Sequence, residues 1–188
     1  MTAEDLRAQD DQARTPRLRR LDRVFPDAPV YFVTATTANR RHLLASSPVH
    51  ECFIRFANSG AARGAWVGRY VLMPDHLHPF VAFDDEQIRL PTWMKSLKNT
   101  ISKQLGLNGA APPHWQKGFF DHVLRSDESY SEKWNYVRDN PVRAGLVLRS
   151  DDWPYQGEIH PLDVRGHRPP LQLPLLCWKP SERPNAHL

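Results

Sequence analysis

The chain has 188 residues, which is enough for one domain with a hydrophobic core and two tails but too short for two ordinary domains. Hydrophobic residues make up 40% and charged residues 24%, a globular composition that excludes a disordered chain or an apolar membrane span. The net charge of +4 favours an anionic partner without identifying it, and Cys52 and Cys177 are too far apart to predict a thiolate metal site.

The N-terminal segment, residues 1–29, is polar and rich in arginine, so we expect a flexible arm. It contains no apolar stretch of signal-peptide length, and we therefore expect a cytoplasmic protein that does not associate with membranes. The domain should start with a strand from Val30 to Thr37, where β-branched and aromatic residues dominate. A helix should follow from Ser47 to Gly60, with Gly60 as its stop.

A β-hairpin is expected in the middle of the domain. Two apolar runs, AWVGRYVLM from Ala65 to Met73 and HLHPFVAF from His76 to Phe83, are separated by Pro74 and Asp75, a combination typical of a tight turn. The next segment, TWMKSLKNTISKQLG, has apolar residues four apart and ends in Gly106, so it predicts an amphipathic helix.

Two further elements are expected after this helix. The segment WQKGFFDHVLR, from Trp115 to Arg125, predicts a short strand. A last helix should begin with Ser126 or Asp127 as its N-cap and end before Pro141.

The expected element order defines the fold class. An order of βαββαβ with an additional C-terminal helix fits an α+β, ferredoxin-like antiparallel sheet. We expect this domain to span residues 30–157. Residues 158–188 are so rich in proline that we expect an extended tail there.

The strand predicted from His76 onward carries the first candidate site. Because side chains alternate along a strand, His76 and His78 should project from one face and Leu77 from the other. Two imidazoles on a rigid strand can bind one divalent cation, such as Mg²⁺ or Mn²⁺, and leave positions open for a phosphate. A pair of histidines in this spacing also arises for packing reasons alone.

The last predicted helix carries the second candidate site. Tyr136 and Asn140 are four residues apart and should share a helix face, with Lys133 on the same stripe. A tyrosine beside a metal-bound phosphate can act as a nucleophile, and an amide oxygen can be a third metal ligand. The alternative is an ordinary half-buried tyrosine. We assign the neighbouring stripe to the core: Tyr130, Trp134 and Val137.

Three strings together resemble the REP-associated tyrosine transposases, which belong with the HUH single-tyrosine (IS200-like) transposases. They are YVLMPDHLH, WQKGFFDHVLR and ESYSEKWNYVRDNPVRAGLV, in this order and at these distances. The resemblance spans roughly residues 30–155. It implies a ferredoxin-like domain that binds single-stranded or hairpin DNA and cleaves a phosphodiester near the foot of the hairpin.

The resemblance also implies roles for individual residues. Tyr136 matches the nucleophile, which becomes joined to the 5′ phosphate while a 3′ hydroxyl is released. His76 and His78 match the metal-binding pair, and Asn140 matches the position of a third, polar ligand. Attack by another 3′ hydroxyl on the adduct would complete strand transfer without a nucleotide cofactor. REP-associated members look monomeric, so we expect a monomer, although related insertion-sequence enzymes form dimers.

Several residues are candidates for DNA contacts, and for each an ordinary surface or core role remains open. Cationic side chains could bind phosphates: Arg125, Arg138, Arg143, Lys95 and Lys98. His122 could join the site. Aromatic residues of the predicted strand segment could stack on bases or pack in the core: Trp115, Phe119 and Phe120.

Pro79 is the main departure from what an interior strand tolerates. It removes a ladder donor directly after the histidine pair, so the strand could be bulged or unpaired there, and the metal geometry could suffer. Two alternatives to a transposase therefore stay open. One is a catalytically inactive nucleic-acid-binding descendant. The other is a metal phosphodiesterase that activates water in place of a tyrosine.

Overall fold

The structure is a computed structural model that describes residues 29–83, 88–124 and 130–162. Its strands are β1 (Val30–Thr36), β2 (Ala65–Leu72), β3 (His76–Phe83), β4 (Phe120–Leu124) and β5 (Gln156–Glu158). Its α-helices are α1 (Ser47–Ala61), α2 (Leu90–Leu107), α3 (Tyr130–Arg138) and α4 (Asn140–Arg143), and short 3₁₀ turns lie at Ala38–Arg40 and Ser150–Asp152. No helix in these ranges is both long and apolar enough to span a bilayer.

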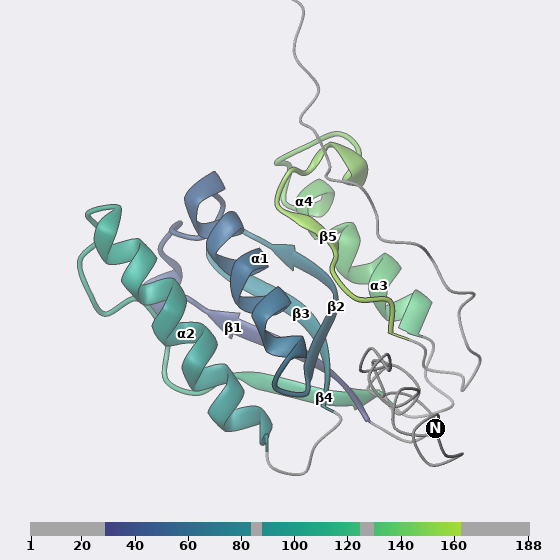
Figure 1. Ribbon diagram of the computed structural model, residues 1–188. Helices are drawn as coiled ribbons and strands as arrows, with labels where there is room; N and C mark the ends of the chain where they lie inside the picture. Colours follow the sequence, from purple (N-terminus) through teal and green to yellow (C-terminus); the bar gives the residue numbers. More distant parts are fainter. Residues whose placement is uncertain (1–28, 84–87, 125–129, 163–188) are drawn as a thin grey trace, which may run out of the picture.

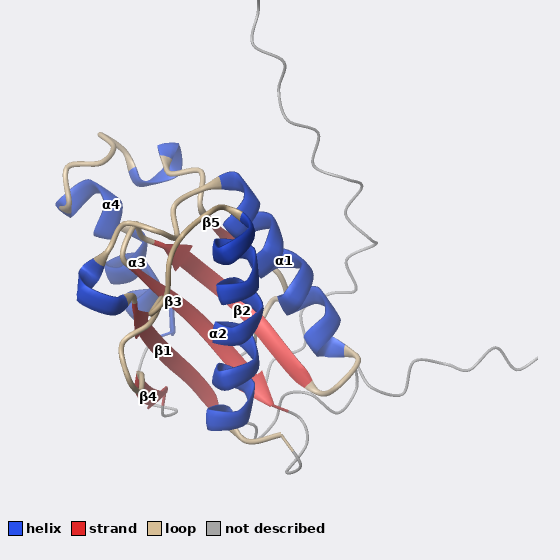
Figure 2. Ribbon diagram, turned by 90° about the vertical axis from the view of Figure 1, so that its left-hand side faces the viewer, coloured by secondary structure: helices blue, strands red, loops and turns tan. Residues whose placement is uncertain are grey.

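The five strands form one antiparallel sheet in the order β4-β1-β3-β2-β5. The first four strands have the order expected of a ferredoxin-like βαββαβ fold, so the predicted fold class is confirmed. Helices α1 and α2 cover one face of the sheet, and α3 covers the other (Figures 1 and 2). Sheet side chains therefore pack in two separate cores, one on each face.

The residues on β3 show how the alternation of a strand divides these two cores. Leu77 and Val81 are buried with α1 and α2, whereas Phe80 is buried on the opposite face with Trp134 of α3. The stripe of α3 that the sequence assigned to the core, Tyr130, Trp134 and Val137, is indeed buried. Helix α3 is thus fixed on the face from which the even-numbered residues of β3 project.

Strand β2 contains a β-bulge that brings Arg69 onto the face of the sheet that α3 covers. The pairing with β3 shifts register between Val67 and Tyr70, which both lie in the core beneath α1 and α2 although they are three residues apart. At the bulge, a Cβ on Gly68 would lie 2.8 Å from the Tyr130 hydroxyl and 2.7 Å from Leu162. Glycine is therefore required for α3 to approach β2 this closely.

Three elements differ from the sequence-based expectation. The strand expected from Trp115 begins only at Phe120, because Gly118 has a φ of 76° and turns the chain; Trp115 makes an isolated bridge to Thr37. The helix expected to end just before Pro141, with Tyr136 and Asn140 both in it, ends at Arg138, and the short helix α4 begins at Asn140 with Pro141 in its first turn. Proline has no N–H to continue the hydrogen bonding of α3 but suits the start of a helix.

The packed part of the chain also extends further than expected. Strand β5 lies where no strand was expected, and Leu162 is buried in the α3-side core beyond the expected domain end at residue 157. Three residues are too few for periodicity to reveal a strand. The arginine-rich arm, the expected N-cap at Ser126 or Asp127, and the tail from residue 163 lie outside the described residues.

Candidate active site

The two histidines of β3 lie together on the α3 face of the sheet. Their ring centroids are 4.7 Å apart with an interplanar angle of 79°, while Leu77 between them is buried on the other face. His78 is 8% exposed and stacks on Phe32 of the neighbouring strand, with ring centroids 5.3 Å apart. The expectation that both imidazoles share one side of the sheet is confirmed.

Each imidazole is held through its Nδ1 atom. His76 Nδ1 lies 2.6 Å from Oδ1 of Asp75, and His78 Nδ1 lies 2.9 Å from the Thr34 hydroxyl. The tautomer with its proton on Nδ1 satisfies both contacts and leaves Nε2 with the lone pair that a cation needs. Metal-binding histidines in proteins are commonly oriented in this way by a carboxylate or another polar partner. The residues present therefore fit a divalent cation.

Asp75 and Thr34 were not among the residues singled out from the sequence. Asp75 directly precedes His76, so its proximity was readable, whereas Thr34 meets His78 only through the pairing of β1 with β3. Burial raises the pKa of Asp75, but the hydrogen bonds and charges of His76 and Arg40 outweigh it and lower this pKa overall. Asp75 is thus a carboxylate at neutral pH, suited to accept the Nδ1 proton of His76.

Pro79 leaves β3 locally unpaired from β1, one of the two outcomes expected, but does not separate the two histidines. It pairs with Tyr70 of β2, and the bulge there belongs to β2. Pairing with β1 is interrupted at Val33 and Thr34, opposite Pro79 and His78, because proline has no N–H to donate to the facing strand. His78 is held there by its contact with the Thr34 hydroxyl and by its stacking on Phe32.

Burial, together with the nearby charges of His76 and Arg143, lowers the pKa of His78 to about 3, despite the raising effects of the Val33 backbone and of Asp75. The ring is consequently neutral at physiological pH. A neutral imidazole is the form that binds a metal ion.

We expect this buried ring to destabilise the metal-free protein in mild acid. An unfolded histidine gains a proton below pH 6.5, whereas His78 in the folded protein does so only near pH 3, so the unfolded state binds more protons between these values and stability falls as pH falls. At pH 5 the loss from this one ring should be about 2 kcal/mol. Urea unfolding at pH 7 and pH 5, in a chelating buffer, measures it. Equal stability at both values would contradict the buried, neutral ring.

Tyr136 lies on α3 with its side chain in solvent, 65% exposed, so it is not the half-buried core tyrosine of the alternative interpretation. The guanidinium carbon of Arg143 lies 4.3 Å from the centroid of its ring. Nη2 of Arg143 also donates to the Tyr136 carbonyl oxygen at 2.5 Å and to Oδ1 of Asn140. Tyr136 and Asn140 belong to different helices, contrary to expectation, and Arg143 connects them.

The flank of α3 that carries Tyr136 faces the histidine pair. Lys133, one turn before Tyr136, has its Nζ 5.8 Å from the centroid of Phe32, the ring on which His78 stacks. The charge of Arg143 also contributes to the lowered pKa of His78, which requires the guanidinium to lie near that ring. The two candidate clusters from distant parts of the sequence thus lie on the same face of the sheet.

The other predicted DNA contacts are distributed over the molecule. Arg138 lies on the opposite flank of α3, where it pairs with Asp151 at 3.9 Å. Lys95 and Lys98 lie on α2, on the far face of the sheet, and Nζ of Lys98 donates to the carbonyl oxygens of Gln116 and Gly118. Arg125 lies outside the described residues. Among the candidates that the structure describes, only Arg143 lies near both His78 and Tyr136.

The remaining candidates divide between core and surface. The Trp115 indole donates to the Lys98 carbonyl oxygen. Trp115 and Phe119 both pack against the core under α2, which favours a role in the core over stacking on bases. Phe120 is exposed on β4. His122 faces Phe32 across the β1–β4 pairing and so lies on the same face of the sheet as His78.

Comparison with known proteins finds similarity to one group of enzymes. No protein-family model matches the chain. A REP-associated tyrosine transposase of Escherichia coli K12 is 23% identical over 66% of this chain and 73% of its own length. A Haemophilus influenzae protein provisionally described under the same name is 27% identical, over 51% of this chain and 64% of its own length.

A solved structure supports the same relationship in three dimensions. The structure of a REP-associated tyrosine transposase bound to a REP hairpin superimposes with a TM-score of 0.55, covering 68% of this chain and 75% of that one at 23% identity. This similarity shows the fold. In sequence and in fold, the chain is similar to the REP-associated tyrosine transposases that its three motifs indicated.

Proposed function

We propose that this protein cleaves single-stranded DNA and transfers the strand through a 5′-phosphotyrosine formed on Tyr136, with a divalent cation held by His76 and His78. The observation that supports the proposal is the placement of an exposed tyrosine and an oriented histidine pair on the same face of the sheet. Either cluster alone would have a purely structural explanation.

The residues divide the chemistry between them. A bound Mg²⁺ or Mn²⁺ ion would polarise the scissile phosphate, with His76, His78 and the Asn140 amide oxygen as its protein ligands. The Tyr136 oxygen attacks phosphorus, its proton passes to solvent, the bond from phosphorus to the 3′ oxygen breaks, and that oxygen takes up a proton. Attack by a new 3′ hydroxyl reverses these steps and releases Tyr136.

Arg143 has two roles in this proposal. Its guanidinium over the Tyr136 ring limits the positions the side chain can occupy, and its charge is available to the phosphate that the tyrosine attacks. The Asn140 amide oxygen has two lone pairs and uses one of them to accept from Arg143, so the other is available to a cation. The partner we propose is hairpin-bearing single-stranded DNA, since the solved relative was bound to a REP hairpin.

Covalent trapping tests the proposal. The purified protein is incubated with hairpin-bearing single strands labelled on either side of the hairpin, and denaturing gels detect protein joined to DNA. We expect an adduct that retains the label 3′ of the cut, requires Mg²⁺ or Mn²⁺, and disappears with EDTA. A plain duplex of the same sequence is the control and should give none.

The outcomes separate the alternatives. Cleavage without an adduct would indicate that the site activates water, as in a metal phosphodiesterase. Binding without cleavage in any divalent metal would indicate an inactive DNA-binding descendant. Either result would contradict the phosphotyrosine.

A further inference from the structure

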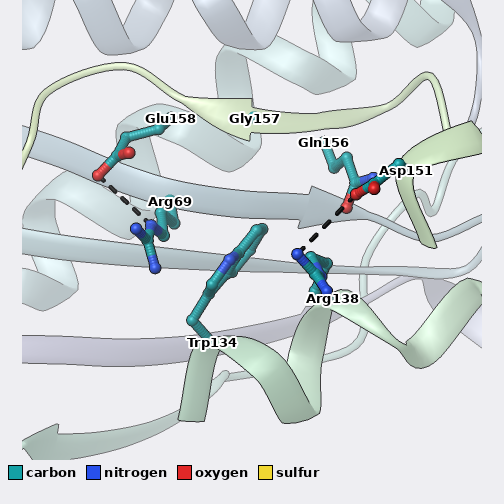
Figure 3. A pocket seen from close by; sticks show the side chains of 7 residues that line it. All are labelled: Arg69, Trp134, Arg138, Asp151, Gln156, Gly157 and Glu158. Carbon is teal, nitrogen blue, oxygen red and sulfur yellow. Dashed lines mark ion pairs between the residues drawn. The ribbon is translucent and has the colours of Figure 1, made fainter. Parts of the chain in front are cut away.

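A hollow of about 290 Å³ lies on the flank of α3 that faces away from Tyr136. Its walls come from β2, α3, the 3₁₀ turn before Trp153, and β5. Figure 3 shows Trp134 between the two arginines of this hollow, Arg69 and Arg138. A single helix, α3, therefore separates the hollow from the candidate active site.

The charges around this hollow balance. Arg69 pairs with Glu158 at 3.5 Å, and Arg138 pairs with Asp151 at 3.9 Å, as the dashed lines in Figure 3 mark. Two guanidinium groups thus face two carboxylates. A bare phosphate would meet as much negative as positive charge, so the hollow favours a neutral ligand over an anion.

Two polar atoms in the hollow have no hydrogen-bond partner among the described residues. They are Nε of Arg138, a donor, and Oε1 of Gln156, an acceptor, and both are buried from solvent. The amide of Gln156 is oriented by its Nε2, which donates to the Ser150 carbonyl oxygen. Buried polar atoms are almost always paired in native proteins, so this unpaired donor and acceptor, on two residues that line the hollow, match a ligand that presents both once their side chains turn toward it.

A planar ligand also suits the aromatic wall. The Trp134 indole stacks against Arg69, whose guanidinium carbon lies 5.5 Å from the ring centroid, and lies beside the open donor and acceptor. A nucleobase is neutral, planar, and carries donors and acceptors along one edge. Stacking of bases on aromatic or guanidinium groups is a common part of single-strand recognition.

We propose that this hollow, formed by Arg69, Trp134, Arg138, Asp151 and Gln156, binds one unpaired nucleobase of the DNA strand. The inference rests on the proposed function for the strand itself and adds a base-reading site on the other flank of α3. A base bound there would fix the strand across the helix that carries Tyr136.

Binding measurements on matched ligands test the pocket. The probes are fluorescently labelled single-stranded decanucleotides of mixed sequence and a decamer of equal charge whose sugars carry no base. The readout is the ratio of the two affinities by fluorescence anisotropy, because phosphate contacts cancel in it. The wild type should favour the base-bearing probe. Gln156→Leu should lower that preference about tenfold, the loss of one buried, oriented hydrogen bond.

Two variants serve as controls. Gln156→Glu keeps an acceptor oxygen but loses the Nε2 donation to Ser150 that orients it, so its preference should lie between those of the wild type and Gln156→Leu. Gln104 lies on α2, away from the hollow, and its amide donates a hydrogen bond to Asn108. Gln104→Leu should therefore leave the ratio of the two affinities unchanged. Equal affinities of the wild type for both probes, or an unchanged ratio in Gln156→Leu, would overturn the pocket.

A second measurement covers the case in which Gln156→Leu does not fold. In NMR spectra of the wild type, the Gln156 amide and Trp134 indole signals should shift with the base-bearing decamer and not with the base-free one. Equal shifts with both probes, or none, would overturn the proposal. Adduct formation by the wild type is scored separately: an adduct without base preference refutes the pocket alone, and its absence refutes the proposed function.

Discussion

Tyr136→Phe should abolish both DNA cleavage and the covalent adduct while leaving the fold and DNA binding intact. The phenylalanine keeps the ring over which Arg143 lies and removes only the oxygen that must attack phosphorus. Because the side chain is mostly in solvent, the loss of its hydroxyl should change stability by less than about 0.5 kcal/mol. Denaturing gels measure the adduct, and thermal unfolding measures the stability.

Tyr130→Phe is the matched control on the same helix. The Tyr130 hydroxyl accepts a hydrogen bond from the backbone N–H of Arg69 at 3.1 Å, so this variant should lose about 1 kcal/mol of stability and keep its activity. The two variants thus have opposite signatures. An adduct that persists in Tyr136→Phe, or one that is lost in Tyr130→Phe, would show that Tyr136 is not the nucleophile.

Most of the fold could be predicted because its elements have strong periodicity or clear boundaries. The strand beginning at His76 and the amphipathic helix ending near Gly106 were found with errors of at most a few residues. The short strand β5 could not be predicted, since its residues are polar and its place depends on pairing with β2. The helix break at Asp139 was missed because we placed the effect of Pro141 at the wrong residue.

The candidate site was predictable in part for a similar reason. Alternation along β3 was sufficient to place His76 and His78 on one face, and helix spacing was sufficient to separate exposed Tyr136 from buried Tyr130. The partners that orient the rings required the register of β1 against β3, which no local pattern contains. No local pattern could predict either that Arg138 and Arg143 lie on opposite flanks of α3, because this depends on how α3 is rotated over the sheet.

His76→Ala should remove metal binding and metal-dependent cleavage while Tyr136 stays in place. Loss of an outer partner of a metal ligand already costs about 10–100-fold in affinity, so loss of a ligand itself should cost more than about a hundredfold. The His76 side chain is 20% exposed, and Arg40 still pairs with Asp75 at 3.1 Å in its absence, so the fold should survive. Titration with Mn²⁺, followed by electron paramagnetic resonance, measures the affinity directly.

Two further variants locate the effect at the site. Asp75→Asn keeps His76 but weakens the contact to its Nδ1, so its Mn²⁺ affinity should fall between those of the wild type and His76→Ala. His42→Ala removes an exposed imidazole that contributes to neither cluster and should bind Mn²⁺ and cleave DNA as the wild type does. If His76→Ala binds Mn²⁺ with wild-type affinity, the paired rings on β3 are a packing feature of the sheet, and the cation must be held elsewhere.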